Sequence, residues 1–183
     1  MPYLNELGNP ALQRAVRQCG IEPPDDVLLI SLGEKKLRHL HRGALVNSYP
    51  CSSSLRPPSC RENSYGTPLG LHKVVEKIGD GAPAGMVFIG RESTGQCYWE
   101  RADAGPEQRM YVTTRILRLR GLEAGRNAGP GVDTFDRFVY IHGTCHPERF
   151  PENLSAGCII LLDGDLIALF DAVPEGSLLW IEL

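Results

Sequence analysis

Residues 140–162 read YIHGTCHPERFPENLSAGCIILL, and this stretch carries the pattern that decides the fold. A strand-like run leads into His142-Gly143-Thr144, a polar loop follows, and Ser155-Ala156-Gly157-Cys158 returns the chain to a second apolar run. Short apolar runs bounded by turn residues are typical of β-strands. A histidine at the end of one such segment and a cysteine at the start of the next can meet across the loop that joins them.

This arrangement suits nucleophilic chemistry. A cysteine attacks as its thiolate, so it needs a lowered pKa or a neighbouring base, and His142 can be that base. Gly157 leaves space beside the sulfur of Cys158, so backbone amides there can point toward a developing oxyanion. Gly143 similarly frees the backbone beside His142, whose second ring nitrogen needs an acceptor to fix its tautomer. Spacing alone fits both a catalytic pair and a buried, inert cysteine.

Short strands separated by turn residues make up most of the remaining chain. Apolar or alternating runs predict strands at 27–32, 36–41, 44–49, 72–77, 86–89, 110–113, 115–119, 137–141 and 178–181. The first three strands form a β-meander. Many strands and few helices predict a mainly β domain, either a sandwich or a partly closed barrel.

Two helices are predicted, one near each end of the chain. Asn9 can cap a short amphipathic helix that ends at Gly20. Residues 163–172 place apolar side chains at helical spacing and predict one late helix. We therefore expect residues 1–26 to form a helix and a linker, and residues 27–183 to form the main part of a single domain.

The composition is that of an ordinary globular protein. The 183 residues are 42% hydrophobic and 22% charged, and the formal net charge is −3 at pH 7. No basic stripe points to nucleic acid, and no apolar run is long enough to span a membrane. Residues 1–20 lack the basic and apolar regions of a secretory signal, so we expect a cytoplasmic protein, or a periplasmic one if another route exports it. The sequence does not indicate an oligomeric state.

The six cysteines show no C-x-x-C pair, and without an export signal we expect free thiols. The alternative is a bridge between Cys51 and Cys60 in an oxidising compartment. A metal site built from His142, Cys145 and His146 is disfavoured, because companion ligands at zinc spacing are missing. No metal or organic cofactor is predicted. Cys145 is also the weaker candidate nucleophile, because it lacks a flanking glycine.

The ordered motifs resemble the L,D-transpeptidase (YkuD-like) family, whose signature is H-G-T, a loop, S-H-G-C, an apolar residue and Arg. The two motif segments quoted above match it in order and spacing. The stretch Thr67-Pro68-Leu69-Gly70 resembles the family's T-P-x-G strand entry, and Val132-Asp133-Thr134 precedes the H-G-T strand as expected. The resemblance covers roughly residues 27–183. It implies a YkuD-like mixed β-sandwich or partly closed barrel.

The resemblance also implies a role for each motif residue. Cys158 would be the nucleophile. His142 would take the thiol proton, and the backbone carbonyl of Gly143 would orient the imidazole ring. Backbone amides of Ala156, Gly157 and Cys158 would hold the oxyanion of the tetrahedral intermediate.

Four further residues are candidates for substrate binding. His72 follows the T-P-x-G element and either lines the cleft or is a hydrogen-bonded structural histidine. Arg115 either receives a stem-peptide carboxylate or serves a structural role on its strand. Ser155 and Thr144 lie within the two motifs, and Ser155 is favoured as a structural hydrogen-bonding group near His142.

Two positions depart from the family signature. Ala156 stands where the motif has histidine, and a backbone amide there survives the change. Ile160 stands where the motif has arginine, so a guanidinium that would anchor a substrate carboxylate or backbone carbonyls is missing. We expect substrate binding to differ from that of the usual transpeptidase.

The implied activity is a two-step acyl transfer on peptidoglycan stem peptides. The thiolate attacks the carbonyl of the third stem residue and expels the fourth, D-Ala. Transfer to water is L,D-carboxypeptidase action, and transfer to a neighbouring stem is cross-linking. Cross-linking requires polymerised wall, which lies outside the membrane. Because residues 1–20 lack a secretory signal, we expect the protein to meet soluble muropeptides instead and to hydrolyse them during recycling. The alternatives are an L,D-transpeptidase and an inactive peptidoglycan-binding module. A papain-like protease is disfavoured, because its cysteine precedes its histidine.

Overall fold

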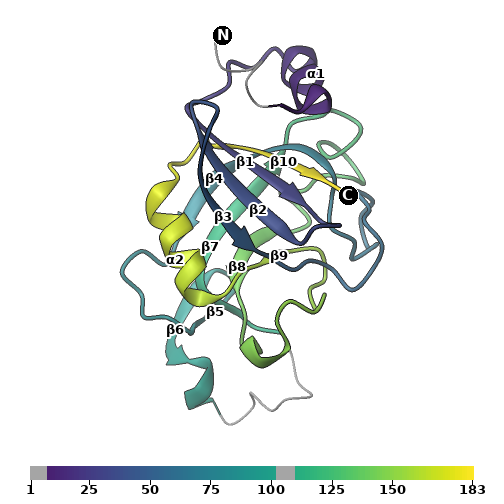
Figure 1. Ribbon diagram of the computed structural model, residues 1–183. Helices are drawn as coiled ribbons and strands as arrows, with labels where there is room; N and C mark the ends of the chain where they lie inside the picture. Colours follow the sequence, from purple (N-terminus) through teal and green to yellow (C-terminus); the bar gives the residue numbers. More distant parts are fainter. Residues whose placement is uncertain (1–7, 102–109) are drawn as a thin grey trace.

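The computed structural model describes residues 8–101 and 110–183, and its architecture is mainly β (Figure 1). Within these ranges ten strands form one mixed sheet, flanked by two α-helices. The helices are α1 (Pro10–Gln18) and α2 (Asp163–Ala172), with short 3-10 helices η2 (Tyr98–Glu100) and η3 (Pro147–Arg149). The strands are β1 (Asp26–Ser31), β2 (Lys36–His41), β3 (Ala44–Pro50), β4 (Gly70–Ile78), β5 (Met86–Ile89), β6 (Glu92–Cys97), β7 (Val112–Gly121), β8 (Tyr140–Gly143), β9 (Ile159–Ile160) and β10 (Leu178–Glu182).

The sheet is open rather than closed into a barrel. Its strands follow the order β3-β2-β1-β10-β4-β7-β5-β6, and β8 branches from β7 and pairs in turn with β9. The pairs β1–β10 and β8–β9 are parallel, and the other strand pairs are antiparallel. The mainly β prediction, with one helix near each end of the chain, is confirmed.

Most predicted elements lie within a few residues of the observed ones, and three differ for physical reasons. The predicted strands at 110–113 and 115–119 are one strand, β7, interrupted by a bulge where Thr114 adopts a φ of 70°. The predicted strand at 137–141 begins only at Tyr140, because Phe138 has a positive φ of 56° and bends the chain. Strands β6 and β9 were not predicted, since β6 is mostly polar and β9 is two residues long.

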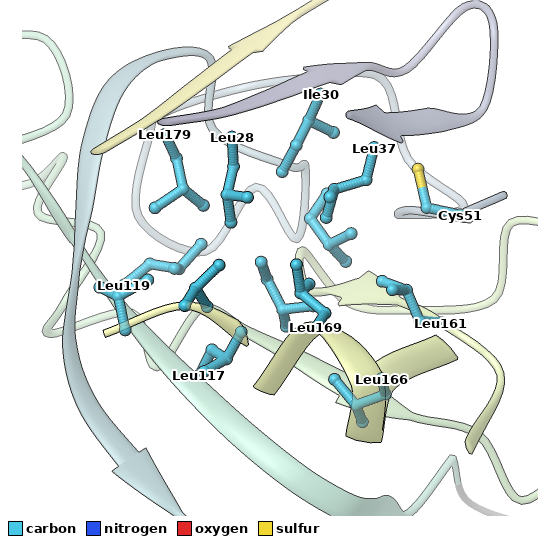
Figure 2. Close-up of a cluster of buried hydrophobic side chains, with 14 of the residues drawn as sticks. Leu28, Ile30, Leu37, Cys51, Leu117, Leu119, Leu161, Leu166, Leu169 and Leu179 are labelled. Atoms are coloured by element: carbon cyan, nitrogen blue, oxygen red, sulfur yellow. The ribbon is translucent and has the colours of Figure 1, made fainter. Parts of the chain in front are cut away.

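The main core lies between α2 and the sheet. Leu166, Leu169 and Phe170 of α2 are buried, and Figure 2 shows Leu166 and Leu169 in one cluster with Leu117 and Leu119 of β7. Strands β8 and β9 contribute Ile141 and Ile159 to this same core. Because side chains alternate along a strand, the neighbouring residues face away from the core. This division positions the site described below.

A second apolar cluster joins α1 to the sheet. Leu12, Ala15 and Val16 of α1 pack with a set that includes Leu71 and Trp180. The helix begins as predicted, with the side chain of Asn9 accepting hydrogen bonds from the first-turn amides. Although α1 lies at one end of the molecule in Figure 1, its apolar face belongs to the folded domain.

Replacing a core residue of α2 tests this packing. Leu169 is fully buried, so Leu169→Ala should lower the free energy of unfolding by about 2–5 kcal/mol through lost burial and a residual cavity. Leu45→Ala is the control, because that side chain is 61% exposed and its loss should change stability by less than about 0.5 kcal/mol. Urea unfolding followed by circular dichroism measures both. Equal effects of the two substitutions would contradict the assigned core.

Candidate active site

The register of β8 against β9 brings the two motif segments together. Ile141 pairs with Ile159, and His142 pairs with Ile160, in parallel orientation. Because side chains alternate along a strand, Ile141 and Ile159 enter the main core together, and His142 faces the opposite side. Cys158 immediately precedes β9, and parallel register aligns it with Tyr140, the residue two positions before His142 on the same face of β8.

Contacts of the sulfur confirm this placement. The backbone amide of Tyr140 donates to Cys158 Sγ at 3.4 Å, and Sγ lies 3.6 Å from the carbonyl oxygen of Phe138. Cys158 also packs against the apolar cluster that contains Tyr140 and Ile116. The structure therefore places Cys158 and His142 on one face of adjoining segments.

The imidazole of His142 is buried and oriented by its neighbour. Its Nδ1 lies 2.6 Å from the carbonyl oxygen of Gly143, the contact expected from the motif. A carbonyl oxygen only accepts, so Nδ1 carries the hydrogen and Nε2 keeps its lone pair. Burial lowers the pKa of His142 to about 4, although the hydrogen bond to Gly143 opposes this shift. At neutral pH the ring is therefore an uncharged base.

Gly143 is held in a tight polar cage that leaves no room for a side chain. A Cβ at this position would stand 2.6 Å from Thr113 Oγ1, 2.8 Å from Asp163 Oδ1 and 2.9 Å from Thr114 Oγ1. Thr114 Oγ1 donates to Asp163 Oδ1, and the amide of Gly85 donates to Thr114 Oγ1. The cage thus fixes the carbonyl that orients His142. Sequence reasoning missed it, because the β7 bulge and the start of α2 supply its members.

The thiol of Cys158 is neutral in the resting protein. Its burial raises the pKa to about 11, and two weaker influences act in the opposite direction: the hydrogen bond from the Tyr140 amide and the charge of Arg137. The resting pair is therefore a thiol and a neutral imidazole, not a thiolate and an imidazolium. Attack on a substrate then requires proton transfer from sulfur to nitrogen.

Ser155 braces the turn that presents Cys158. Its hydroxyl donates to the carbonyl oxygen of Cys158 at 2.6 Å and accepts from the amide of Gly157 at 3.2 Å. The structural role predicted for Ser155 is thus observed as two contacts inside the turn. Gly157 is needed here for its φ of 123°, a conformation that L residues rarely adopt.

This turn changes the interpretation of the oxyanion hole. The amide of Gly157 was expected to face the oxyanion, but Ser155 Oγ already accepts its hydrogen. The amides of Cys158 and Ala156 are the remaining candidates from the motif, and Ala156 is exposed at the surface. The difference arises because a serine two residues earlier competes for the glycine amide, as serine side chains commonly do in turns.

His72 and Arg115 lie inside the domain in structural roles. His72 is fully buried between the carbonyl of Gly70 and the hydroxyl of Thr134, and burial lowers its pKa to about 4. Arg115 is 5% exposed, and its Nη1 donates to the backbone carbonyls of Ala82 and Thr114. Both match the structural alternative stated for them, and neither presents its polar group to a substrate here.

The remaining motif residues also lie below the surface. Thr144 is 3% exposed, and its hydroxyl accepts from the amide of His146 and contacts Met110 Sδ. Cys145 is buried in a separate apolar cluster, and its sulfur accepts from the amide of Tyr111. In the described part of the chain, no three His, Cys, Asp or Glu side chains converge as a metal site. All six cysteines are free thiols, including Cys51 and Cys60.

Ile160, which replaces the signature arginine, is sealed in the sheet. It is 1% exposed, and its backbone exchanges two hydrogen bonds with Ser52, each 2.9 Å long. The position beside His142 where the family signature has arginine is therefore occupied by a buried apolar side chain.

No helix among the described residues combines the length and apolar character needed to cross a bilayer.

A cavity of about 230 Å³ opens beside the turn. Its wall includes Tyr65, Arg137, Phe138 and Ala156. Arg137 was not singled out by sequence reasoning, because nothing in the local pattern distinguishes it from a surface arginine. Only the folded chain brings it next to Gly157 in the turn that carries Cys158.

The fold and this site together define a mainly β catalytic domain with a candidate cysteine nucleophile. Residues 25–181 match the model of the L,D-transpeptidase catalytic domain (YkuD), and the chain belongs to that family. Comparison with curated proteins gives no match.

Solved structures share the fold. An L,D-transpeptidase from Mycobacterium smegmatis is 16% identical with a TM-score of 0.52, over 87% of this chain and 59% of that one. L,D-transpeptidase 3 from Mycobacterium tuberculosis, in complex with a faropenem-derived adduct, is 18% identical with a TM-score of 0.52, over 87% and 61%. An L,D-transpeptidase from Xylanimonas cellulosilytica is 16% identical with a TM-score of 0.50, over 92% and 68%. The chain thus spans about three fifths of the first two.

Alkylation of Cys158 across pH tests its neutral resting state. With a thiol pKa of about 11, the rate of reaction with iodoacetamide should rise roughly tenfold per pH unit from pH 7 to pH 10 without levelling. Peptide mapping by mass spectrometry follows Cys158 separately from the other thiols. The urea-unfolded chain is the control, and its rate should level near pH 8.5 to 9. A plateau below pH 8 in the folded protein would instead indicate a resting thiolate.

Proposed function

We propose that this chain is a cysteine-dependent acyl-transfer enzyme that cleaves the L,D amide bond between residues three and four of peptidoglycan tetrapeptide stems. One observation carries the proposal. The β8–β9 register sets Cys158 and His142 on one face, with His142 neutral and its Nε2 lone pair available. Membership of the L,D-transpeptidase catalytic domain family supports the substrate class.

The first half-reaction forms a thioester. His142 Nε2 takes the proton of Cys158 Sγ as the sulfur attacks the carbonyl carbon of the third stem residue. The tetrahedral intermediate collapses when the C–N bond breaks, and the imidazolium returns its proton to the departing amine of D-Ala. Because both resting groups are neutral, no charge is buried until substrate is in place.

The developing oxyanion needs donors near the nucleophile. The amides of Cys158 and Ala156 are the candidates, since Ser155 occupies the amide of Gly157. The hydroxyl of Ser155 also holds the carbonyl of Cys158, which fixes the orientation of the peptide units on both sides of the nucleophile. Loss of one oxyanion donor typically costs about 100–1,000-fold in rate.

In the second half-reaction we favour water as the acceptor. His142 would take a proton from water, hydroxide would attack the thioester, and the thiol would be restored with its proton. Ile160 supports this choice, because its sealed apolar side chain offers no anchor for the carboxylates of a second stem. In this proposal the enzyme is an L,D-carboxypeptidase acting on soluble muropeptides of wall recycling, with the cytoplasm as its compartment.

Incubation with a disaccharide-tetrapeptide tests the activity directly. The expected product is the tripeptide, lighter by one alanine residue in mass spectrometry. Cys158→Ser should reduce the rate to background while leaving the circular dichroism spectrum unchanged, because only the sulfur is replaced. Cys145→Ser is the matched control and should retain cleavage, since that thiol lies in another cluster.

Adding a D-amino acid to the same reaction separates the alternatives. Incorporation of the D-amino acid at position four would identify an exchanging L,D-transpeptidase and contradict the hydrolytic assignment. Binding of the tetrapeptide without any cleavage would identify an inactive peptidoglycan-binding module and overturn the enzyme proposal.

The pH dependence of cleavage follows from the buried base. His142 must be neutral to accept the thiol proton, so kcat/KM should fall only as the pH drops through about 4. An imidazole with its ordinary pKa would place the fall near 6.5. Initial rates between pH 3.5 and pH 8, with circular dichroism at each pH to detect unfolding, make the measurement. An acidic limb near pH 6.5 in a folded protein would exclude the assigned state of His142.

A further inference from the structure

We infer that Arg137 is a positioning residue for the nucleophile: its guanidinium, held by the 59–66 loop, stabilises the negative charge that develops on Cys158 Sγ. The inference rests on the proposed function, because it assigns a role in the same reaction.

Arg137 stands next to the turn that carries the nucleophile. Its Nη2 is 3.8 Å from the point where a Cβ on Gly157 would stand, and the carbonyl oxygen of Gly66 is 3.3 Å from the same point. One residue further along the chain, the Phe138 carbonyl lies near Cys158 Sγ. The Arg137 guanidinium and the Gly66 carbonyl therefore both lie close to the turn that carries Cys158.

Three neutral acceptors fix the guanidinium there. Nη1 donates to the carbonyl of Ser59 at 3.1 Å, and Nη2 donates to the carbonyl of Gly66 at 2.7 Å and to Ser64 Oγ at 3.4 Å. Carbonyl and hydroxyl partners hold the fork in position without cancelling its charge. Across residues 8–101 and 110–183, no carboxylate lies within ion-pair distance of Arg137.

The charge of Arg137 therefore interacts with nearby titratable groups, among them Cys158. Half-burial lowers the pKa of Arg137 itself, while Cys60, Cys158 and Glu62 raise it. The guanidinium stays protonated, because arginine side chains do not lose their proton in proteins. Among the groups that face Cys158, His142 is neutral, so Arg137 is the cation that lowers the pKa of the thiol against the effect of burial.

Arg137 also lies in the wall of the cavity beside the turn that carries Cys158. It lines the 230 Å³ cavity with Phe138 and Ala156, and the acidic residues Glu62 and Asp136 belong to the same wall. A cation at the wall of this cavity is already in position when the sulfur loses its proton. Such preorganised charge needs no rearrangement during the reaction.

The test compares Cys158 alkylation in three variants of the full chain. Arg137→Gln should raise the apparent pKa of Cys158 and slow its reaction with iodoacetamide at pH 8 by about three- to tenfold. Arg137→Lys keeps the charge and should restore most of the rate. Ser64→Ala removes one contact of the loop but keeps the charge, so its pH profile should match that of the unchanged protein.

Each outcome decides the matter. An unchanged profile in Arg137→Gln, or an equal shift in Ser64→Ala, would show that Arg137 serves only to hold the loop. If Arg137→Gln fails to fold, the neutral variant Arg137→Met takes its place: a profile shifted to higher pH in Arg137→Met but not in Arg137→Lys supports the inference, and an unshifted profile in Arg137→Met overturns it. Alkylation does not depend on cleavage of a tetrapeptide, so the inference and the proposed function can fail separately.

Discussion

Two parallel register pairs between β8 and β9 determine the site. Ile141 with Ile159, and His142 with Ile160, align the two motif segments, and the buried isoleucines of the first pair anchor that alignment in the main core. A slip of one residue would turn every side chain to the other face, so it would move His142 into the apolar core and take an isoleucine out of that core. The core therefore enforces the register, and the register sets Cys158 and His142 on one face of the two segments.

Burial on this face then sets the protonation states. Loss of hydration favours the uncharged form of both the thiol and the imidazole, so it raises the pKa of Cys158 and lowers the pKa of His142. The tautomer of His142 follows from a single carbonyl, and that carbonyl depends on the cage of Thr113, Thr114 and Asp163 around Gly143. Electrostatics and packing at the site are thus consequences of the same strand arrangement.

The parts of the site that follow local sequence rules were predictable. Strand and helix positions follow from hydrophobic spacing and turn residues, whereas the pairing of Cys158 with His142 and the contact of His142 with the Gly143 carbonyl were expected from the family resemblance. The other features depend on contacts between distant segments. Arg137 is brought to Cys158 by the 59–66 loop, and burial of Arg115 depends on the bulge in β7.

Competition within a turn explains the remaining difference. The Ser155 hydroxyl occupies the amide of Gly157, although the motif alone suggested that this amide was available to an oxyanion. Serine, glycine and cysteine in this order are compatible with either arrangement. Only the φ of 123° at Gly157 and the position of Ser155 Oγ select the one observed.

The N-terminal helix has a practical consequence for anyone who trims this chain. The family match begins at residue 25, yet Leu12 and Val16 of α1 cover Leu71 and Trp180. A fragment cut at the match boundary would also lose Asn9, whose amide donates to the Glu182 carboxylate that the Trp180 indole also contacts. Such a fragment would expose the apolar residues that α1 covers, and exposed apolar surface favours self-association. Poor solubility of the fragment would then result from the loss of α1, not from a property of the catalytic domain.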